Sequence, residues 1–179
     1  MIFGKKKKEK EIFRAENTND AGEYKILDEF NVPEISYDGV FDRLPKQTAE
    51  QKLLELEKMD DLQFEFYICK IFQLKGYDVR FTPVVDDYGA DLIIERAGVA
   101  TAIRCRQVNG GALLDTDIVE GALAALKYYP CDDVMIITNG YFTKEAARRA
   151  FRAKVSLVDR NALISGFLNY KITPSPAPR

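Results

Sequence analysis

The chain has 179 residues, with 26 Lys and Arg, 28 Asp and Glu, and no histidine. This length predicts one domain with additional terminal segments, and a hydrophobic fraction of 46% is sufficient for a buried core. The absence of histidine excludes Ser-His-Asp and Cys-His relays and zinc sites built on imidazole. Acid–base or metal chemistry must therefore rest on carboxylates, lysines or water, and oxygen ligands favour hard ions such as Mg²⁺ or Ca²⁺.

The three cysteines, Cys69, Cys105 and Cys131, lie far apart in apolar stretches and form no CxxC pair. We predict that they are reduced core residues, as is typical of a cytoplasmic protein. No segment approaches the roughly 20 apolar residues of a membrane-spanning helix. The basic N-terminus is not followed by the apolar segment of a signal peptide, so we expect none.

The terminal segments differ in composition from the rest of the chain. Residues 1–46 predict a disordered or extended leader, basic around Lys5–Lys8 and acidic further on. The lysine run could contact nucleic acid or an anionic membrane surface, or remain a solvated arm, and the leader could dock on a protein partner. Residues 47–59 predict a linking helix, and the alternating prolines of residues 171–179 predict a disordered tail.

Residues 60–170 contain the periodic segments of a folded domain. Asp60 or Asp61 can cap its first helix, and Gly76 can end it. Strands that alternate with helices predict an α/β fold with a mixed sheet covered on both faces. The expected elements are a helix over 61–75, strands over 77–82, 90–96 and 99–108, a helix over 116–129 capped by Thr116, a strand over 133–138, a helix over 144–153 capped by Thr143, a strand over 155–158 and a helix over 162–168.

The hairpin around Ala97-Gly98 brings charged side chains together. A two-residue turn there places Asp91 opposite Arg104, whereas a longer loop would shift this register. Because side chains alternate across a strand, Asp91, Arg104 and Arg106 share one face. The opposite, core face carries Leu92, Ile94, Ile103 and Cys105.

Two further carboxylates could join this charged group. Asp87 precedes Gly89, which permits a sharp approach to the strand. Glu65 lies in a helix that is apolar almost all round, where a carboxylate is costly unless a cation accompanies it. The alternative for Glu65 is an exposed position on a narrow polar strip.

Several short motifs follow one another in an order and spacing that are specific as a set. They are Phe64-Glu65, Lys75-Gly76-Tyr77, Asp87-x-Gly89-x-Asp91 followed by Leu92-Ile93-Ile94, Ile136 to Thr143, and Leu157-Val158-Asp159-Arg160. Through them the segment 60–168 resembles the Mrr-type restriction endonuclease domain, a branch of the PD-(D/E)xK nuclease superfamily. The resemblance implies a restriction-endonuclease-like fold, with a mixed β-sheet flanked by helices, and it does not include the leader.

The resemblance also implies a site. In the family, an Asp at the Asp91 position and a Gln or Glu on the facing strand bind Mg²⁺, a Lys two residues later orients or activates water, and the Glu65 position is an auxiliary acid. The family's Gln-Cys-Lys is Arg104-Cys105-Arg106 here. Arg104 offers no acceptor and brings a positive charge to the ion's place, and Arg106 cannot accept a proton. We expect that the metal site is lost and that Arg104 pairs with Asp91; the alternative places both arginines on an exposed hairpin face.

A basic cluster on the predicted late helix could extend a DNA-binding surface. It comprises Arg148, Arg149, Arg152 and Lys154, although complementing the negative C-terminal end of the helix explains these residues equally well. The sequence pI of about 5.4 indicates that any positive field is local.

Three functional hypotheses remain open. The first is an Mrr-type restriction endonuclease-like protein that binds double-stranded DNA with a degraded catalytic centre, a pseudoenzyme that could be a homo-oligomer. The second is an active, divergent DNA endonuclease with Glu65, Asp87 and Asp91 as Mg²⁺ ligands and Arg106 stabilising phosphoryl charge. The third is a protein-interaction or regulatory module that reuses the nuclease fold. Mg²⁺ is the only cofactor expected, and only for the active form; fold alone does not choose among the three.

Overall fold

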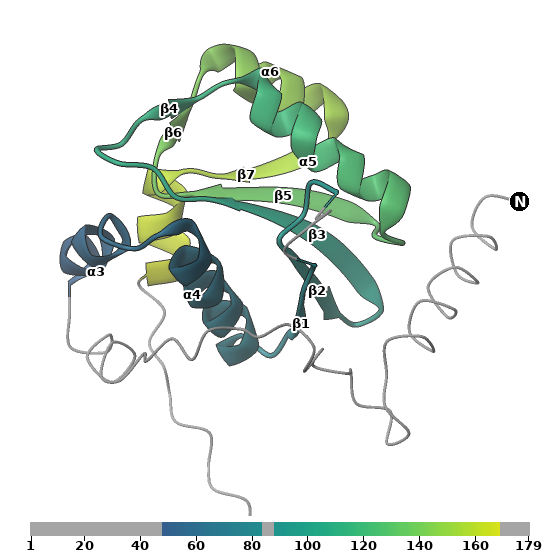
Figure 1. Ribbon diagram of the computed structural model, residues 1–179, viewed down its shortest axis with the longest axis horizontal. Coiled ribbons are helices and arrows are strands. Elements are labelled where there is room, and N and C mark those ends of the chain that lie inside the picture. The colour runs from purple at the N-terminus through teal and green to yellow at the C-terminus, as the bar shows by residue number, and fades with distance from the viewer. Residues whose placement is uncertain (1–47, 84–87, 169–179) are drawn as a thin grey trace, which may run out of the picture.

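The computed structural model describes residues 48–83 and 88–168, so the expectations for the leader, for Asp87 and for the tail lie outside it. The described residues form a layered molecule in which helices lie on either side of a central sheet (Figure 1). Within these two ranges, every helix is too short or too polar to span a membrane.

The central sheet has five strands in the order β1-β2-β3-β5-β7. β1, β2 and β3 are antiparallel neighbours, whereas β3, β5 and β7 are parallel because helices connect them. The predicted mixed α/β architecture is therefore confirmed. The strands are β1 (Asp78–Phe81), β2 (Leu92–Arg96), β3 (Val99–Arg106), β5 (Asp133–Thr138) and β7 (Val155–Val158).

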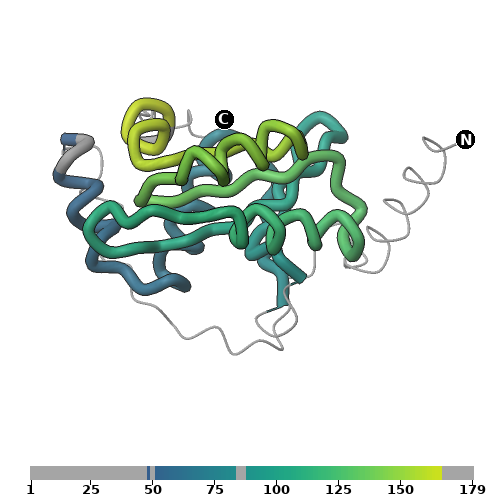
Figure 2. The backbone as a smooth tube through the Cα atoms, turned by 90° about the horizontal axis from the view of Figure 1, so that it is seen from above, coloured from purple at the N-terminus to yellow at the C-terminus, as the bar shows by residue number. Residues whose placement is uncertain are grey.

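Helices cover both faces of this sheet, as Figures 1 and 2 show from two directions. α3 (Ala49–Leu56) and α4 (Asp61–Leu74) lie on one face. α5 (Thr116–Tyr128) and α6 (Lys144–Ala153) lie on the other. The final helix, α7 (Arg160–Ala162), continues into a π-helical turn, η2 (Leu163–Leu168).

Each face of the sheet has its own hydrophobic cluster, and the hairpin contributes to both. Leu92 and Ile103 pack in the cluster under α4, as the predicted core face requires, and Ile93 and Ala102 pack in the cluster under α5 and α6. The face that carries Arg104 is therefore also covered over much of its length. The three cysteines are buried and form no disulfide, which confirms their prediction as core residues.

Local sequence signals correctly predicted the caps of α4 and α6 but not that of α5. Asp60 caps α4 through a capping box with Gln63, in which Asp60 Oδ1 accepts from Gln63 N at 2.7 Å. Thr143 caps α6 as predicted. The predicted cap of α5 was wrong by one residue, because Asp115 accepts from the Thr116 backbone N–H at 2.7 Å and Thr116 is already helical.

Other elements also differ from the predictions. The strand expected from residue 90 begins at Leu92, and the last helix begins at Arg160 because Asp159 caps it. A two-stranded parallel sheet of β4 (Leu113–Leu114) and β6 (Tyr141–Phe142) was not predicted. Two residues are too few to show the alternation by which strands are recognised.

Candidate functional site

The β2–β3 hairpin positions the site residues. Ala97 and Gly98 both have positive φ values, 52° and 79°, as a type I′ turn requires. Leu92 consequently pairs with Ile103, which is the predicted register. This register brings the residue before β2, Asp91, next to Arg104 on β3.

The Asp91 carboxylate accepts hydrogen bonds on both oxygens. Arg104 Nη1 donates to Asp91 Oδ1 at 2.9 Å, and the Cys105 backbone N–H donates to Oδ2 at 2.6 Å. Asp91 is 9% exposed and Arg104 is 20% exposed. The expected ion pair is thus present, and Arg104 does not lie free on an open hairpin face.

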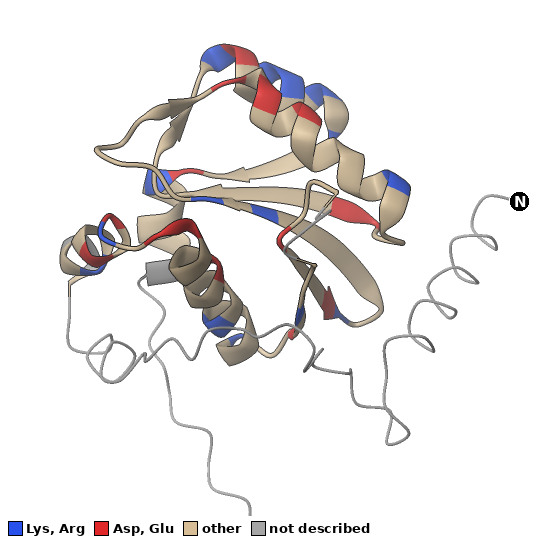
Figure 3. Ribbon diagram, in the orientation of Figure 1, with Lys and Arg blue, Asp and Glu red and all other residues tan. Residues whose placement is uncertain are grey.

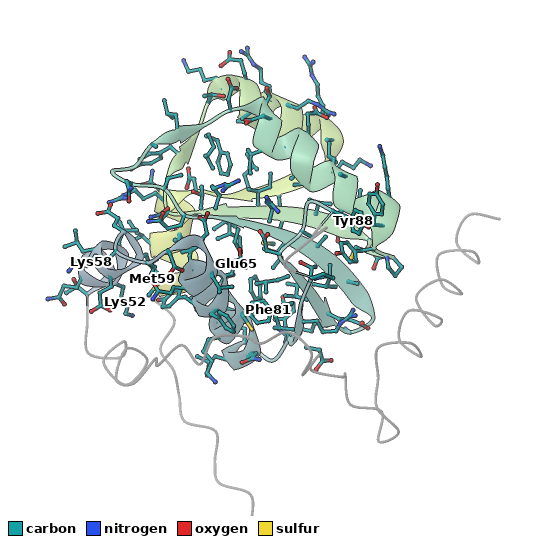
Figure 4. The ribbon with its side chains drawn as sticks, viewed as in Figure 1. Lys52, Lys58, Met59, Glu65, Phe81 and Tyr88 are labelled. Atoms are coloured by element: carbon teal, nitrogen blue, oxygen red, sulfur yellow. The ribbon has the colours of Figure 1, made fainter. Side chains whose placement is uncertain are left out.

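Glu65, like Asp91, acts electrostatically on the thiol of Cys105. It projects from α4 on the side that faces the sheet (Figure 4), and its side chain is partly buried. Burial raises the pKa of the Cys105 thiol well above its ordinary value, and the charges of Asp91 and Glu65 raise it further. The structure therefore gathers Glu65 and Asp91 around Cys105, while Asp87 is outside the described residues.

This donor set does not fit a divalent cation. Mg²⁺ requires several oxygen ligands in an octahedron, but the guanidinium of Arg104 lies directly against the Asp91 carboxylate and has no acceptor. In the described part of the chain, no three Cys, Asp or Glu side chains are grouped so that they could hold a metal ion. Among the described residues, the charge of the Asp91 carboxylate is thus balanced by the guanidinium of Arg104.

Arg106 is held more loosely at the end of β3. Its Nη1 lies 3.4 Å from Asp61 Oδ2 in the first turn of α4, and the two side chains are 39% and 58% exposed. From the sequence, Asp61 was predicted only as a possible helix cap, not as a partner of Arg106. The exposed fraction along this face thus increases from Arg104 to Arg106.

The arginines of α6 belong to a different surface. Arg149 donates to both carboxylate oxygens of Glu120 on α5, at 2.5 and 3.1 Å, and Arg148 is paired with Glu145. The opposite side of α6 packs on the sheet through its buried alanines. In Figure 3 the basic positions of α6 lie on the outer side of the helical layer, away from those of β3. The structure does not bring this cluster to Asp91.

A family model described as restriction endonuclease, the Mrr catalytic domain, matches residues 56–166, more than half of the chain. The chain belongs to the Mrr restriction endonuclease family. No curated protein matches the sequence.

The chain is also similar to solved structures at low sequence identity. The DNA modification-dependent restriction endonuclease AspBHI is 16% identical with a TM-score of 0.53, covering 69% of this chain and 36% of that one. The MspJI restriction endonuclease, in complex with a 27-mer oligonucleotide, is 14% identical with a TM-score of 0.48, covering 76% and 34%. A protein of unknown function, AF1548, is 18% identical with a TM-score of 0.47, covering 53% and 55%. The chain therefore spans less than two thirds of each of these proteins.

The Mrr-type domain also has a buried polar turn at Asn139 that was not predicted from the sequence. Asn139 is fully buried, accepts from the Val108 N–H at 2.7 Å and donates to the Val108 carbonyl at 2.9 Å. A Cβ on Gly140 would lie 2.4 Å from Val108 Cγ2, so only glycine fits there. This turn fixes the segment that follows Arg106, and the only signal for it was its place in the family motif.

A second contact that was not predicted joins Glu57, just after α3, to the same turn through Arg160. Arg160 Nη1 donates to Glu57 Oε1 at 2.6 Å and to the Asn139 carbonyl at 3.2 Å. The Gln107 side chain donates to the Glu57 carbonyl at 3.2 Å. Glu57, which follows α3, is thereby bonded to Gln107, just after β3, and to Arg160, just after β7.

Proposed function

We propose that this Mrr-type domain binds duplex DNA without cleaving it. The observation that carries the proposal is the pairing of Arg104 with Asp91, because it fills the position where the family's metal-binding chemistry would take place. Family membership supports DNA as the partner, and the altered strand Arg104-Cys105-Arg106 supports the loss of hydrolysis.

The residue types on β3 suit phosphate binding better than phosphate hydrolysis. Arg106 presents a planar fork of donors that matches a phosphate. A guanidinium does not act as a proton acceptor for water. Arg104 is committed to Asp91, so Arg106, the more exposed of the two, is the proposed contact with the DNA backbone.

Other parts of the chain enter the proposal in a smaller role. Arg148, Arg149 and Arg152 lie on α6, on a different surface from Arg106, so we assign them a smaller role in DNA binding than Arg106. A protein partner for the leader, a homo-oligomeric assembly and a cytoplasmic location remain proposals. The three buried cysteines form no disulfide, which is compatible with a reducing compartment.

Cleavage and binding assays together test the proposal. With Mg²⁺ or Mn²⁺ present, purified protein should not nick supercoiled plasmid. Metal-dependent nicking that disappears in Asp91→Ala would overturn the proposal and establish an active, divergent endonuclease instead. The Asp91→Ala protein is the control for a contaminating nuclease.

A gel shift with plain duplex DNA tests the binding half. We expect a shift at about 50 mM salt that weakens steeply with added salt, because phosphate contacts release counterions. Arg106→Gln should weaken binding, whereas Arg148→Gln, an equal loss of charge on α6, should have a smaller effect. No binding at low salt would favour a protein-interaction module.

A further inference from the structure

Three arginines near the end of β3 each have a carboxylate partner, and the three pairs differ in exposure. Arg104–Asp91 and Arg160–Glu57 are largely buried, at 2.9 and 2.6 Å. Arg106–Asp61 is the exposed pair, with a single contact of 3.4 Å between Nη1 and Oδ2. The first two pairs are therefore built into the packing, and the third is accessible from outside.

The Arg106–Asp61 pair is suited to exchange. Exposed ion pairs contribute little to stability, since water screens them and two long side chains must be ordered. A contact of 3.4 Å is also long for a charge-assisted hydrogen bond, which is typically about 2.7–2.9 Å. A phosphate offers a guanidinium two parallel, short bonds, so it can replace Asp61.

Asp61 does not depend on Arg106 for its exposed position. It is the first residue of α4, where the positive end of the helix dipole stabilises a carboxylate. Release of Arg106 therefore leaves Asp61 in a favourable place. Its neighbour Asp60 forms the capping box and does not need Asp61 for it.

We propose that Arg106 is a binding site for a DNA backbone phosphate and that Asp61 occupies this site in the free protein. The first turn of α4 then lowers DNA affinity by competing with phosphate for one guanidinium. This inference rests on the proposed DNA-binding function and concerns the regulation of that same site.

The chain contains a matched control for Asp61. Glu145 also lies in the first turn of a helix, α6, and is paired with a single arginine, Arg148. Its side chain is 62% exposed, against 58% for Asp61. Asp61→Asn and Glu145→Gln thus remove the same charge from equivalent positions, only one of which faces Arg106.

The test is the affinity of a fluorescein-labelled duplex of about 30 bp, measured by anisotropy over a range of salt concentrations. Asp61→Asn should bind about three- to five-fold more tightly than the unchanged protein, the range expected for removal of an exposed ion pair. Glu145→Gln should bind within about two-fold of the unchanged protein, through net charge alone.

A double variant separates competition from simple repulsion. In an Arg106→Gln background, Asp61→Asn should lose most of its effect, because no guanidinium remains to be released. Equal effects of Asp61→Asn and Glu145→Gln, or an undiminished effect without Arg106, would overturn the inference while DNA binding stands. Absence of binding by every variant would overturn the proposed function itself, and the inference with it.

Discussion

Arg104 carries a permanent positive charge, because a guanidinium is not deprotonated in proteins. An ion held by carboxylates can dissociate, but this cation is covalently part of the chain and sits 2.9 Å from Asp91. The carboxylate is neutralised by the fold itself. At the scale of single residues, Arg104 and Asp91 thus form an ion pair between β3 and the residue before β2.

This arrangement predicts the effect of removing Asp91 on stability. Asp91→Ala leaves Arg104 without its carboxylate and removes the acceptor of the Cys105 N–H. We expect the free energy of unfolding in urea to fall by about 2–4 kcal/mol. Glu145→Ala, which breaks an exposed pair, should cost less than about 1 kcal/mol. An Asp91→Ala protein that is more stable would instead indicate repulsion among clustered carboxylates.

The buried thiols predict a dependence of stability on pH. Burial raises the pKa of Cys69 from 9.0 to about 11 and raises that of Cys105 well above its ordinary value. The folded state therefore holds these protons more tightly than the unfolded chain does. The contribution of Cys69 to stability is complete below pH 9 and is lost as the pH rises through 11.

Unfolding in urea at a series of pH values checks this expectation. The midpoint should decrease between pH 9 and pH 11, and Cys69→Ala should reduce that decrease. Alkylation of the native thiols at about pH 8 should be slow and should become fast only on unfolding. Rapid labelling of the native protein would contradict the burial on which the prediction depends.

At the scale of elements, close contacts between backbones determine how β2 begins. Gly89 has a φ of 89°, and a Cβ there would lie 2.0 Å from the Gly121 carbonyl oxygen of α5. The loop before Asp91 therefore packs directly on that helix. Asn139 has the corresponding role on the other side of β3, since it holds both backbone groups of Val108.

Two glycine substitutions separate backbone strain from steric exclusion. Gly98→Ala places a side chain at a φ of 79° in open space and should cost about 1–2 kcal/mol. Gly89→Ala adds a collision with Gly121 to the same strain, so it should cost at least about 3 kcal/mol. Thermal or urea unfolding of the two variants gives the comparison, and equal losses would show that the loop can move away from α5.

At the scale of the whole molecule, the fold retains the framework of a nuclease around a changed centre. The double substitution Arg104→Gln with Arg106→Lys restores the residue types of the family. We expect it to permit weak Mg²⁺- or Mn²⁺-dependent nicking of plasmid and a metal-dependent rise in melting temperature, because a ligand that binds only the native state stabilises it. The unchanged protein is the control, and adding Asp91→Ala should abolish both effects. A double variant that neither binds metal nor cleaves would place the loss of function beyond these two positions.

The sequence by itself determined the features that depend on neighbours along the chain. Periodicity and turn residues predicted most helices and strands, and the short hairpin turn predicted the register that pairs Asp91 with Arg104. These predictions succeed because a two-residue turn leaves little freedom between the strands that it joins. The buried identity of the cysteines followed equally from their apolar surroundings.

Only the tertiary structure decided the contacts between distant segments. Glu57 meets Arg160 across 103 residues, and Arg106 meets Asp61 across 45. No local pattern encodes such pairs, because their geometry is set by how helices pack on the sheet. The same reason explains β4 and β6, which pair at two residues each once packing has brought them together. Which carboxylates Arg106 and Arg160 meet was therefore decided by packing and not by residue type.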